Sequence, residues 1–162
     1  MKVIGIDPGT ASCGYGILQE SGGRLRAIDH GWWQTPAGER PELRLKTIYE
    51  GLAGLIELHQ PDAVALEESF VGADARTALS VGQARGAVMV AAANAGVECA
   101  EYPPARVKQV VCGYGRAEKQ QVQKMVKAIL SMEAAPTPSH AADALAVAIC
   151  HALAPPLLRI AG

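Results

Sequence analysis

A carboxylate at the end of an apolar strand is the feature that most constrains this chain. Residues 3–6 are valine, isoleucine, glycine and isoleucine, and Asp7 follows them directly, before Pro8-Gly9-Thr10. Valine and isoleucine favour strands, and a Pro-Gly pair marks a turn. An ionised carboxylate at the edge of a buried strand is costly unless a cation meets it. Asp7 is therefore the first candidate for a functional residue.

Two further acidic sites lie on separate predicted elements. The apolar segment 63–66 runs into Glu67, and the last predicted helix opens with His140 and Asp143 three residues apart. Side chains three apart project from one side of a helix. Asp7 and Glu67 stand at the carboxyl ends of their strands, where open α/β sheets place ligands. Because oxygen-rich sites suit Mg²⁺ and Mn²⁺, the pattern predicts a cluster that binds divalent cations.

The order of turn signals and hydrophobic periods predicts an α/β fold. Three short strands joined by tight turns are typical of an antiparallel meander, and later strands separated by helices are typical of parallel crossovers. We therefore expect a mixed five-stranded sheet with helices on both faces, with Thr137 as the N-cap and Pro138 as the first residue of the last helix. The expected strands are 2–7, 14–18, 25–33, 62–67 and 97–100, and the expected helices cover 45–56, 74–94, 104–111, 122–130 and 138–151.

Length and composition predict one domain in a reducing compartment. A chain of 162 residues is about one domain long, and we place that domain at 1–153, with a flexible tail at 154–162. The four cysteines are scattered singly, as is typical of reduced thiols. The sequence shows neither a signal-peptide start nor an apolar run of roughly 18 residues, the length that spans a bilayer. These features predict a cytoplasmic protein without a membrane partner.

Positive charge is concentrated in one segment. The net charge of the chain is -1, yet residues 101–127 hold six lysines and arginines against two glutamates. A basic segment on an otherwise acidic body suggests a face that contacts phosphates. A solvated helix surface would give the same pattern, so the charge alone leaves both interpretations open.

Motifs along nearly the whole chain resemble those of one family. From Lys2 to about His151 the sequence is similar to the RuvC family of bacterial Holliday-junction resolvases, which belongs to the RNase H-like, or retroviral integrase, superfamily. The motifs are GIDPG at 5–9, GYG at 14–16, LEESF at 66–70, GQARG at 82–86, VKQ at 107–109, GYGRAEK at 113–119 and HAADALA at 140–146.

The resemblance implies an RNase H-like nuclease. It implies a homodimer that nicks two opposed strands of a four-way DNA junction in recombination and repair, with RuvA and RuvB as branch-migration partners. Two Mg²⁺ or Mn²⁺ ions would be held by Asp7, Glu67, His140 and Asp143, and hydrolysis would leave 5′-phosphate and 3′-hydroxyl ends. Many members carry aspartate at the third position. Since His140 offers a nitrogen, we expect Mn²⁺ to be favoured here.

The resemblance also suggests DNA contacts outside the acidic cluster. Phe70 is the only phenylalanine, and it follows the strand that ends at Glu67. We expect its ring to stack on an unpaired base. Phosphate contacts are expected at Lys108 and Lys119, with Arg76, Arg85 and Arg116 as further candidates.

A pair of glycines interrupts the second predicted helix. Gly82 and Gly86 form a G-x-x-x-G spacing, and glycine weakens a helix unless a backbone must approach closely. The approaching element is either this chain's own sheet or the corresponding helix of a two-fold partner. The sequence does not distinguish these two cases.

Three alternative functions remain open at this point. Asp7-Pro8-Gly9-Thr10 resembles the phosphate loop of kinase-like and actin-like ATPases, although those proteins need two lobes and this chain has room for one. His140 could disable cleavage and leave a junction-binding protein. A related RNase H-like nuclease could act on RNA. Cleavage of a four-way DNA junction beside a linear RNA, in Mg²⁺ and in Mn²⁺, separates these possibilities.

Overall fold

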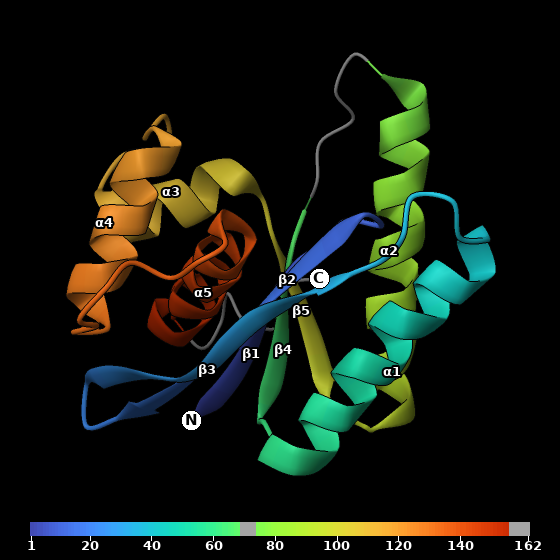
Figure 1. The fold of residues 1–162 in the computed structure, drawn as a ribbon. Coiled ribbons are helices and arrows are strands. Elements are labelled where there is room, and N and C mark those ends of the chain that lie inside the picture. The colour runs from blue at the N-terminus through green and yellow to red at the C-terminus, as the bar shows by residue number, and fades with distance from the viewer. Residues whose placement is uncertain (69–73, 156–162) are drawn as a thin grey trace.

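A mixed five-stranded sheet forms the centre of the molecule. The computed structural model describes residues 1–68 and 74–155. Its first three strands, β1 (Lys2–Asp7), β2 (Ser12–Ser21) and β3 (Arg24–Gln34), form an antiparallel meander. β4 (Ala63–Glu67) pairs in parallel with β1, and β5 (Glu98–Tyr102) pairs in parallel with β4. The strand order is β3-β2-β1-β4-β5, as Figure 1 shows.

Helices cover both faces of this sheet. α1 (Pro41–His59) and α2 (Ala75–Asn94) lie on one face, and α3 (Pro104–Cys112), α4 (Lys119–Ile129) and α5 (Ser139–Leu153) lie on the other (Figure 1). The predicted α/β class, with its mixed five-stranded sheet, is confirmed. None of the helices in the described part of the chain is long and apolar enough to cross a membrane.

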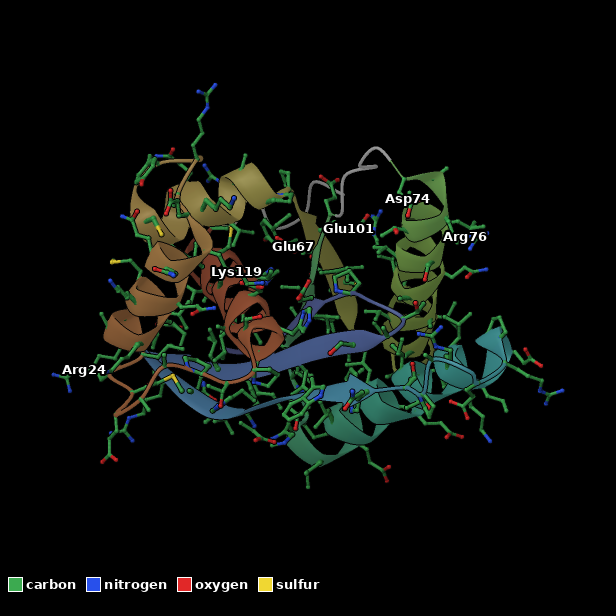
Figure 2. All side chains as sticks on the ribbon, turned by 45° about the horizontal axis from the view of Figure 1, so that its top comes forward. Arg24, Glu67, Asp74, Arg76, Glu101 and Lys119 are labelled. Carbon is green, nitrogen blue, oxygen red and sulfur yellow. The ribbon has the colours of Figure 1, made fainter. Side chains whose placement is uncertain are left out.

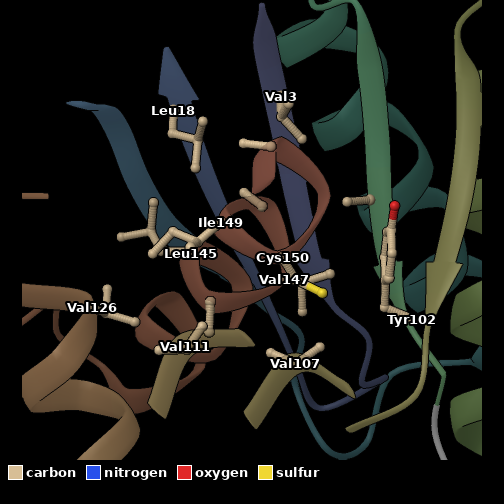
Figure 3. Packing of buried hydrophobic residues seen from close by; sticks show 14 of the residues in the cluster. Val3, Leu18, Tyr102, Val107, Val111, Val126, Leu145, Val147, Ile149 and Cys150 are labelled. Atoms are coloured by element: carbon tan, nitrogen blue, oxygen red, sulfur yellow. The ribbon is translucent and has the colours of Figure 1, made fainter. Parts of the chain in front are cut away.

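Strand alternation divides the core into two layers. Ile4 and Ile6 of β1 pack with Ile48 and Leu52 of α1, whereas Val3 belongs to the opposite layer. Figure 3 shows that second layer, in which Val3 and Leu18 lie beside Leu145 and Ile149 of α5. Complete burial of an aliphatic side chain contributes about 1.5–3 kcal/mol. These two layers therefore fix the sheet between its helices.

Three glycines allow α5 to lie directly on β1 and β2. A Cβ atom at Gly5 would stand 2.0 Å from the Ala144 carbonyl oxygen, and one at Gly14 would stand 2.2 Å from the His140 carbonyl oxygen. A Cβ at Gly16 would lie 2.5 Å from Leu145 Cγ. Because these three positions carry no side chain, α5 can approach the strands closely. This approach carries the start of α5 to the end of β1.

The structure corrects the predicted start of the last helix. Thr137 was expected to be the N-cap, but α5 begins at Ser139 and Pro138 is the cap, with φ −69° and ψ 177°. The Pro138 carbonyl accepts a hydrogen bond from the Ala141 N–H at 3.0 Å. Pro138 is therefore extended and lies outside the helix. The expected Thr137 cap is therefore wrong, since the cap position is held by Pro138 and carries no side-chain hydrogen bond.

The C-terminal boundary also differs from the prediction. α5 continues to Leu153, and Ala154, which was assigned to the tail, is 3% exposed and belongs to the buried cluster that also contains Val111 and Ile149. The folded core thus extends at least one residue beyond the expected limit of 153. Residues 156–162, the rest of the predicted tail, lie outside the described residues.

Candidate active site

Four predicted ligands come together where β1, β4 and α5 meet. Asp7 is the last residue of β1 and Glu67 is the last residue of β4. These strands are parallel neighbours, with Ile6 opposite Leu66, so both carboxylates stand at one edge of the sheet. His140 and Asp143 lie in the first turns of α5. Figure 2 shows Glu67 at this edge, at the end of its strand.

The side chains of this acidic cluster are within direct reach of one another. His140 Nδ1 lies 2.9 Å from Asp7 Oδ2. Asp7, His140 and Asp143 each offer one ligand atom, and these atoms all lie within 4.8 Å of one another. The Glu67 carboxyl lines a cavity together with Asp143, and burial and the charges of Asp7 and Asp143 all raise its pKa. The structure thus brings together all four residues that the sequence predicted.

Mutual repulsion and burial shift the pKa values of this cluster. Burial, followed by the negative charges of Asp7 and Asp143, raises the pKa of Glu67 to about 8. Burial also raises the pKa of Asp143, against the opposing hydrogen bond from Lys119. The hydrogen bond to Asp7 raises the pKa of His140. Each shift reports a concentration of negative charge that a bound cation would relieve.

The donor set fits a divalent cation. Three carboxylates and one imidazole converge from separate elements, and hard divalent cations prefer oxygen ligands. An imidazole nitrogen is also a ligand for transition metals. Burial and the charges of Asp7 and Asp143 raise the pKa of Glu67 even though the charge of Lys108 lowers it, so a cation bound here would stabilise the ionised carboxylate. Asp7, Glu67, His140 and Asp143 are therefore the residues that could hold a metal.

Two lysines border the cluster on the side of α3 and α4. Lys119 Nζ lies 2.7 Å from Asp143 Oδ2. The charge of Lys108 lowers the pKa of Glu67 and so opposes the repulsion from the other carboxylates. Both lysines line a cavity of about 200 Å³ together with Glu67 and Asp143. The predicted phosphate-contacting lysines thus lie beside the carboxylates, and Figure 2 shows Lys119 near Glu67.

A second cavity borders the cluster on the side of α2. It has a volume of about 480 Å³ and reaches from Asp7 and His140 to Arg76 in the first turn of α2. Arg76 is thus brought to the site. The sequence analysis missed the hydroxyl groups of this cavity, although Thr10 follows the Asp7-Pro8-Gly9 turn directly. These hydroxyl-bearing residues are Thr10, Ser12, Thr77 and Ser80.

Two of the predicted DNA contacts, Arg85 and Arg116, do not line the cavities at the cluster. The Arg85 guanidinium donates to Glu101 of β5, and this partner favours a structural role for Arg85. Arg116 is exposed in the connection between α3 and α4, and it does not line either of the two cavities at the cluster. Phe70 lies outside the described residues, so its predicted stacking role stays a prediction.

The glycine pair of α2 does not serve packing against the described part of the chain. A Cβ atom at Gly82 or at Gly86 would meet no atom of the described residues within 4 Å. Close approach to this chain's own sheet was one of two explanations for the pair, and the structure contradicts it. The buried side of α2 is formed instead by Ala84, Val88, Ala91 and Ala92.

Comparison with known proteins places this fold and site in one family. The family model for crossover junction endodeoxyribonuclease RuvC matches residues 3–151. A RuvC protein of Moorella thermoacetica is 53% identical over 152 residues, which cover 94% of this chain and 91% of the relative. One of Chloroflexus aggregans is 50% identical over 159 residues, covering 98% and 97%.

Solved structures agree with the sequence relatives. Thermus thermophilus RuvC in complex with Holliday junction substrate superposes with a TM-score of 0.89 and 40% identity, covering 94% of this chain and 93% of that one. The yeast mitochondrial Holliday junction resolvase Ydc2 has a TM-score of 0.65 at 12% identity, covering 91% and 77%, and so shares the fold. With its nearly complete family match, this chain belongs to the RuvC family of crossover junction endodeoxyribonucleases.

Proposed function

We propose that this chain resolves four-way DNA junctions by paired nicks in opposed strands, in homologous recombination and DNA repair. The observation that carries the proposal is the convergence of Asp7, Glu67, His140 and Asp143 beside Lys119 in a chain of this family. The relatives are endodeoxyribonucleases by name, and one structural neighbour was solved with Holliday junction substrate. Neither the ATPase nor the RNA nuclease alternative has comparable support.

The four ligands would hold two divalent cations, Mg²⁺ or Mn²⁺, which would supply Lewis acidity for attack by water and for departure of the 3′ oxygen, leaving a 5′-phosphate. Burial, followed by the charges of Asp7 and Asp143, raises the pKa of Glu67 to about 8, so this carboxyl holds a proton near neutral pH when no metal is bound. It must release that proton before its carboxylate can serve as a ligand. Metal loading should therefore be favoured as pH rises.

Lys108 and Lys119 would hold the DNA backbone against the carboxylates. Both line the cavity that contains Glu67 and Asp143, and lysine ammonium groups neutralise phosphates without reading sequence. In the free protein, Lys119 is paired with Asp143. Bound DNA would offer this ammonium group a phosphate as its new partner. Arg76, at the far end of the second cavity, would bind a phosphate on the other side of the cluster.

The identity of the preferred metal follows from His140. An imidazole in place of a carboxylate removes one negative charge and one hard oxygen ligand. Mg²⁺ demands near-ideal octahedral oxygen geometry, whereas a transition metal accepts nitrogen more readily. We therefore infer that Mn²⁺ supports cleavage better than Mg²⁺.

A homodimer would form through the outer side of α2. Leu79 is 67% exposed, and Met89 and Val90 are also exposed large apolar residues. Gly82 lies three residues after Leu79, and Gly86 lies three and four residues before Met89 and Val90, so the glycines share one side of the helix with these side chains. Because open space surrounds both glycines, a second helix could approach this side closely. A four-way junction has approximate two-fold symmetry, and a C2 dimer would present two identical acidic clusters to it.

Other partners remain family expectations. RuvA and RuvB are the proposed branch-migration partners, and a DNA substrate places the protein in the cytoplasm of a bacterial cell. Phe70 is proposed to stack on an unpaired base at the junction, which is worth roughly 1–3 kcal/mol per base.

The direct test is Asp7→Asn on a four-way junction. Asp7 contacts His140 and its charge acts on Glu67, so removal of its charge should abolish nicking in both metals. Junction binding should persist, since it rests on the basic residues. Gel-shift and nicking assays on the same preparation measure both properties. Nicking by purified Asp7→Asn, or cleavage of a linear RNA instead of the junction by wild type, would overturn the proposal.

A further inference from the structure

We propose that Thr35 is a positioning residue that holds the turn after Asp7 in place for cleavage. This inference rests on the nuclease function proposed above and adds a residue that lies outside the acidic cluster. Thr35 follows the last residue of β3 and is one of two buried polar residues among those described, at 5% exposure. A threonine hydroxyl in such a place needs partners, because an unpaired buried hydroxyl costs about 1–3 kcal/mol.

Thr35 donates two hydrogen bonds, one from its main-chain N–H and one from its hydroxyl, and both acceptors lie in that turn. The Thr35 N–H donates to the Ala11 carbonyl oxygen at 3.2 Å, and the Thr35 hydroxyl donates to the Thr10 carbonyl oxygen. Residues 8–11 connect β1 to β2. One residue thus holds two successive carbonyls of the turn that starts at Asp7.

The Thr35 hydroxyl is itself held from α1. Arg44 Nε donates to Thr35 Oγ1 at 2.9 Å. With a lone pair occupied by Arg44, the hydroxyl hydrogen is directed to the Thr10 carbonyl. Arg44 lies one turn before Ile48, a fully buried core residue of α1. The turn is therefore anchored to a helix that the core holds rigidly.

The opposite side of the turn faces the acidic cluster and α2. The Thr10 hydroxyl is hydrogen-bonded to the Ser80 hydroxyl of α2. Thr10 and Ser12 form one wall of the cavity of about 480 Å³ that contains Asp7 and His140. Thr35 does not line this cavity. It acts through the turn, whose position decides where a DNA strand in the cavity lies relative to Asp7.

Thr35→Val removes the hydroxyl at nearly constant volume and leaves both Thr10 and Arg44 without their partner. With junction at saturation, the single-turnover nicking rate should fall about tenfold or more, because a displacement near 1 Å can cost about a hundredfold. The junction Kd should change by less than about twofold, since the basic residues are untouched. Thr35→Ser keeps the hydroxyl and should restore the rate.

A matched control lies on α1. The Thr47 hydroxyl donates to the Leu43 carbonyl at 3.1 Å, so Thr47→Val also removes one hydroxyl hydrogen bond, away from the turn. Its nicking rate should equal that of wild type. Arg44→Met is the second variant. It removes the hydrogen bond from Arg44 to the Thr35 hydroxyl but leaves the bond from that hydroxyl to the Thr10 carbonyl. It should therefore slow nicking less than Thr35→Val does.

Hydrogen exchange on the free protein separates this inference from the nuclease function. The amides of residues 9–11 should exchange faster in Thr35→Val and not in Thr47→Val. Faster exchange with slower nicking supports the proposal. Unchanged exchange overturns it, and so does faster exchange with a wild-type nicking rate. A wild-type protein that fails to nick junctions would overturn the proposed function instead, while exchange would still decide whether Thr35 holds the turn.

Discussion

Asp7 Oδ2 and His140 Nδ1 lie 2.9 Å apart although 133 residues separate them in the chain. The contact joins the end of the first strand to the start of the last helix. It also raises the pKa of His140, because the carboxylate favours the imidazolium form. If a cation were held by this Nδ1 and by Asp7, it would have to displace the proton that the two atoms share.

His140→Asp should narrow the difference between the two metals. The substitution would restore a cluster of carboxylates alone, which suits Mg²⁺. We expect wild type to nick faster in Mn²⁺ than in Mg²⁺, and the aspartate variant to show a smaller ratio. Nicking rates across a titration of each metal measure this. An unchanged ratio would mean that His140 does not determine metal preference.

The metal-free protein should lose stability as pH rises. Glu67 keeps its proton in the folded state up to a pKa of about 8 but releases it near the ordinary value of 4.5 when unfolded. Folded protein therefore binds more protons between these values, and the free energy of unfolding falls with pH across this window. The raised pKa values of Asp143 and His140 act in the same direction.

Urea unfolding in EDTA from about pH 5 to about pH 8 tests this expectation. Glu67→Gln cannot titrate and should flatten the profile. Adding Mn²⁺ at the upper end should restore the stability of wild type and have less effect on the variant. A profile that rises with pH in EDTA would contradict the assignment of a raised pKa to Glu67.

Lys119 and Arg116 provide a comparison between two cations of the basic segment. Lys119→Gln removes the ammonium group beside Asp143 and should lower the nicking rate about tenfold or more at saturating junction. Arg116 lines neither cavity at the cluster, so Arg116→Gln should leave that rate unchanged. Equal rate losses in both variants would indicate general phosphate binding and no special position for Lys119.

Gly5→Ala tests the close approach of α5. The added methyl group would collide with the Ala144 backbone, which costs typically about 1–3 kcal/mol in a packed core. Displacement of α5 would also separate Asp143 from Asp7, so nicking should be lost together with stability. Gly54 of α1 has open space around it, and Gly54→Ala should raise stability by about 0.5–1 kcal/mol. Thermal and urea unfolding measure both.

Leu79→Glu should weaken the proposed dimer. It places a charge on the outer side of α2, whereas Leu58→Glu places one on α1 at a residue of similar exposure, 74% against 67%. Sedimentation or light scattering should show dissociation for the first variant only. If Leu58→Glu dissociates the protein and Leu79→Glu does not, the interface lies on α1.

The sequence predicted the acidic cluster because strand ends and helix starts carry local signals. Asp7 and Glu67 each end an apolar run, and the meeting of parallel strand ends at one sheet edge is a general rule. His140 and Asp143, three residues apart at the start of the last predicted helix, completed the set. The structure places Asp7, His140 and Asp143 within reach of one another and Glu67 beside Asp143 in the adjoining cavity; their role as metal ligands stays a prediction.

Side-chain partners that lie far apart in the chain leave no comparable local signal in the sequence. Arg85 looked like a DNA contact until its Glu101 partner on β5 was known. Thr35 lies in a polar stretch before α1, and nothing in its neighbours indicates that it reaches Thr10. The same limit applies to Ala154, since a Pro-Pro pair after it suggested a tail while packing places it in the core. Side-chain pairing across the fold decides these cases.

The close packing of α5 on β1 and β2, which the three glycines allow, has a consequence for synthesis in the cell. Chains emerge from the ribosome N-terminus first, at about 5–20 residues per second. Asp7 is made almost at once, but its partners on α5 follow only after most of the chain has been translated. Nascent and prematurely terminated chains thus lack His140 and Asp143, two of the four proposed ligands. The proposed metal site can be completed only after the final helix has been made and has docked on the sheet.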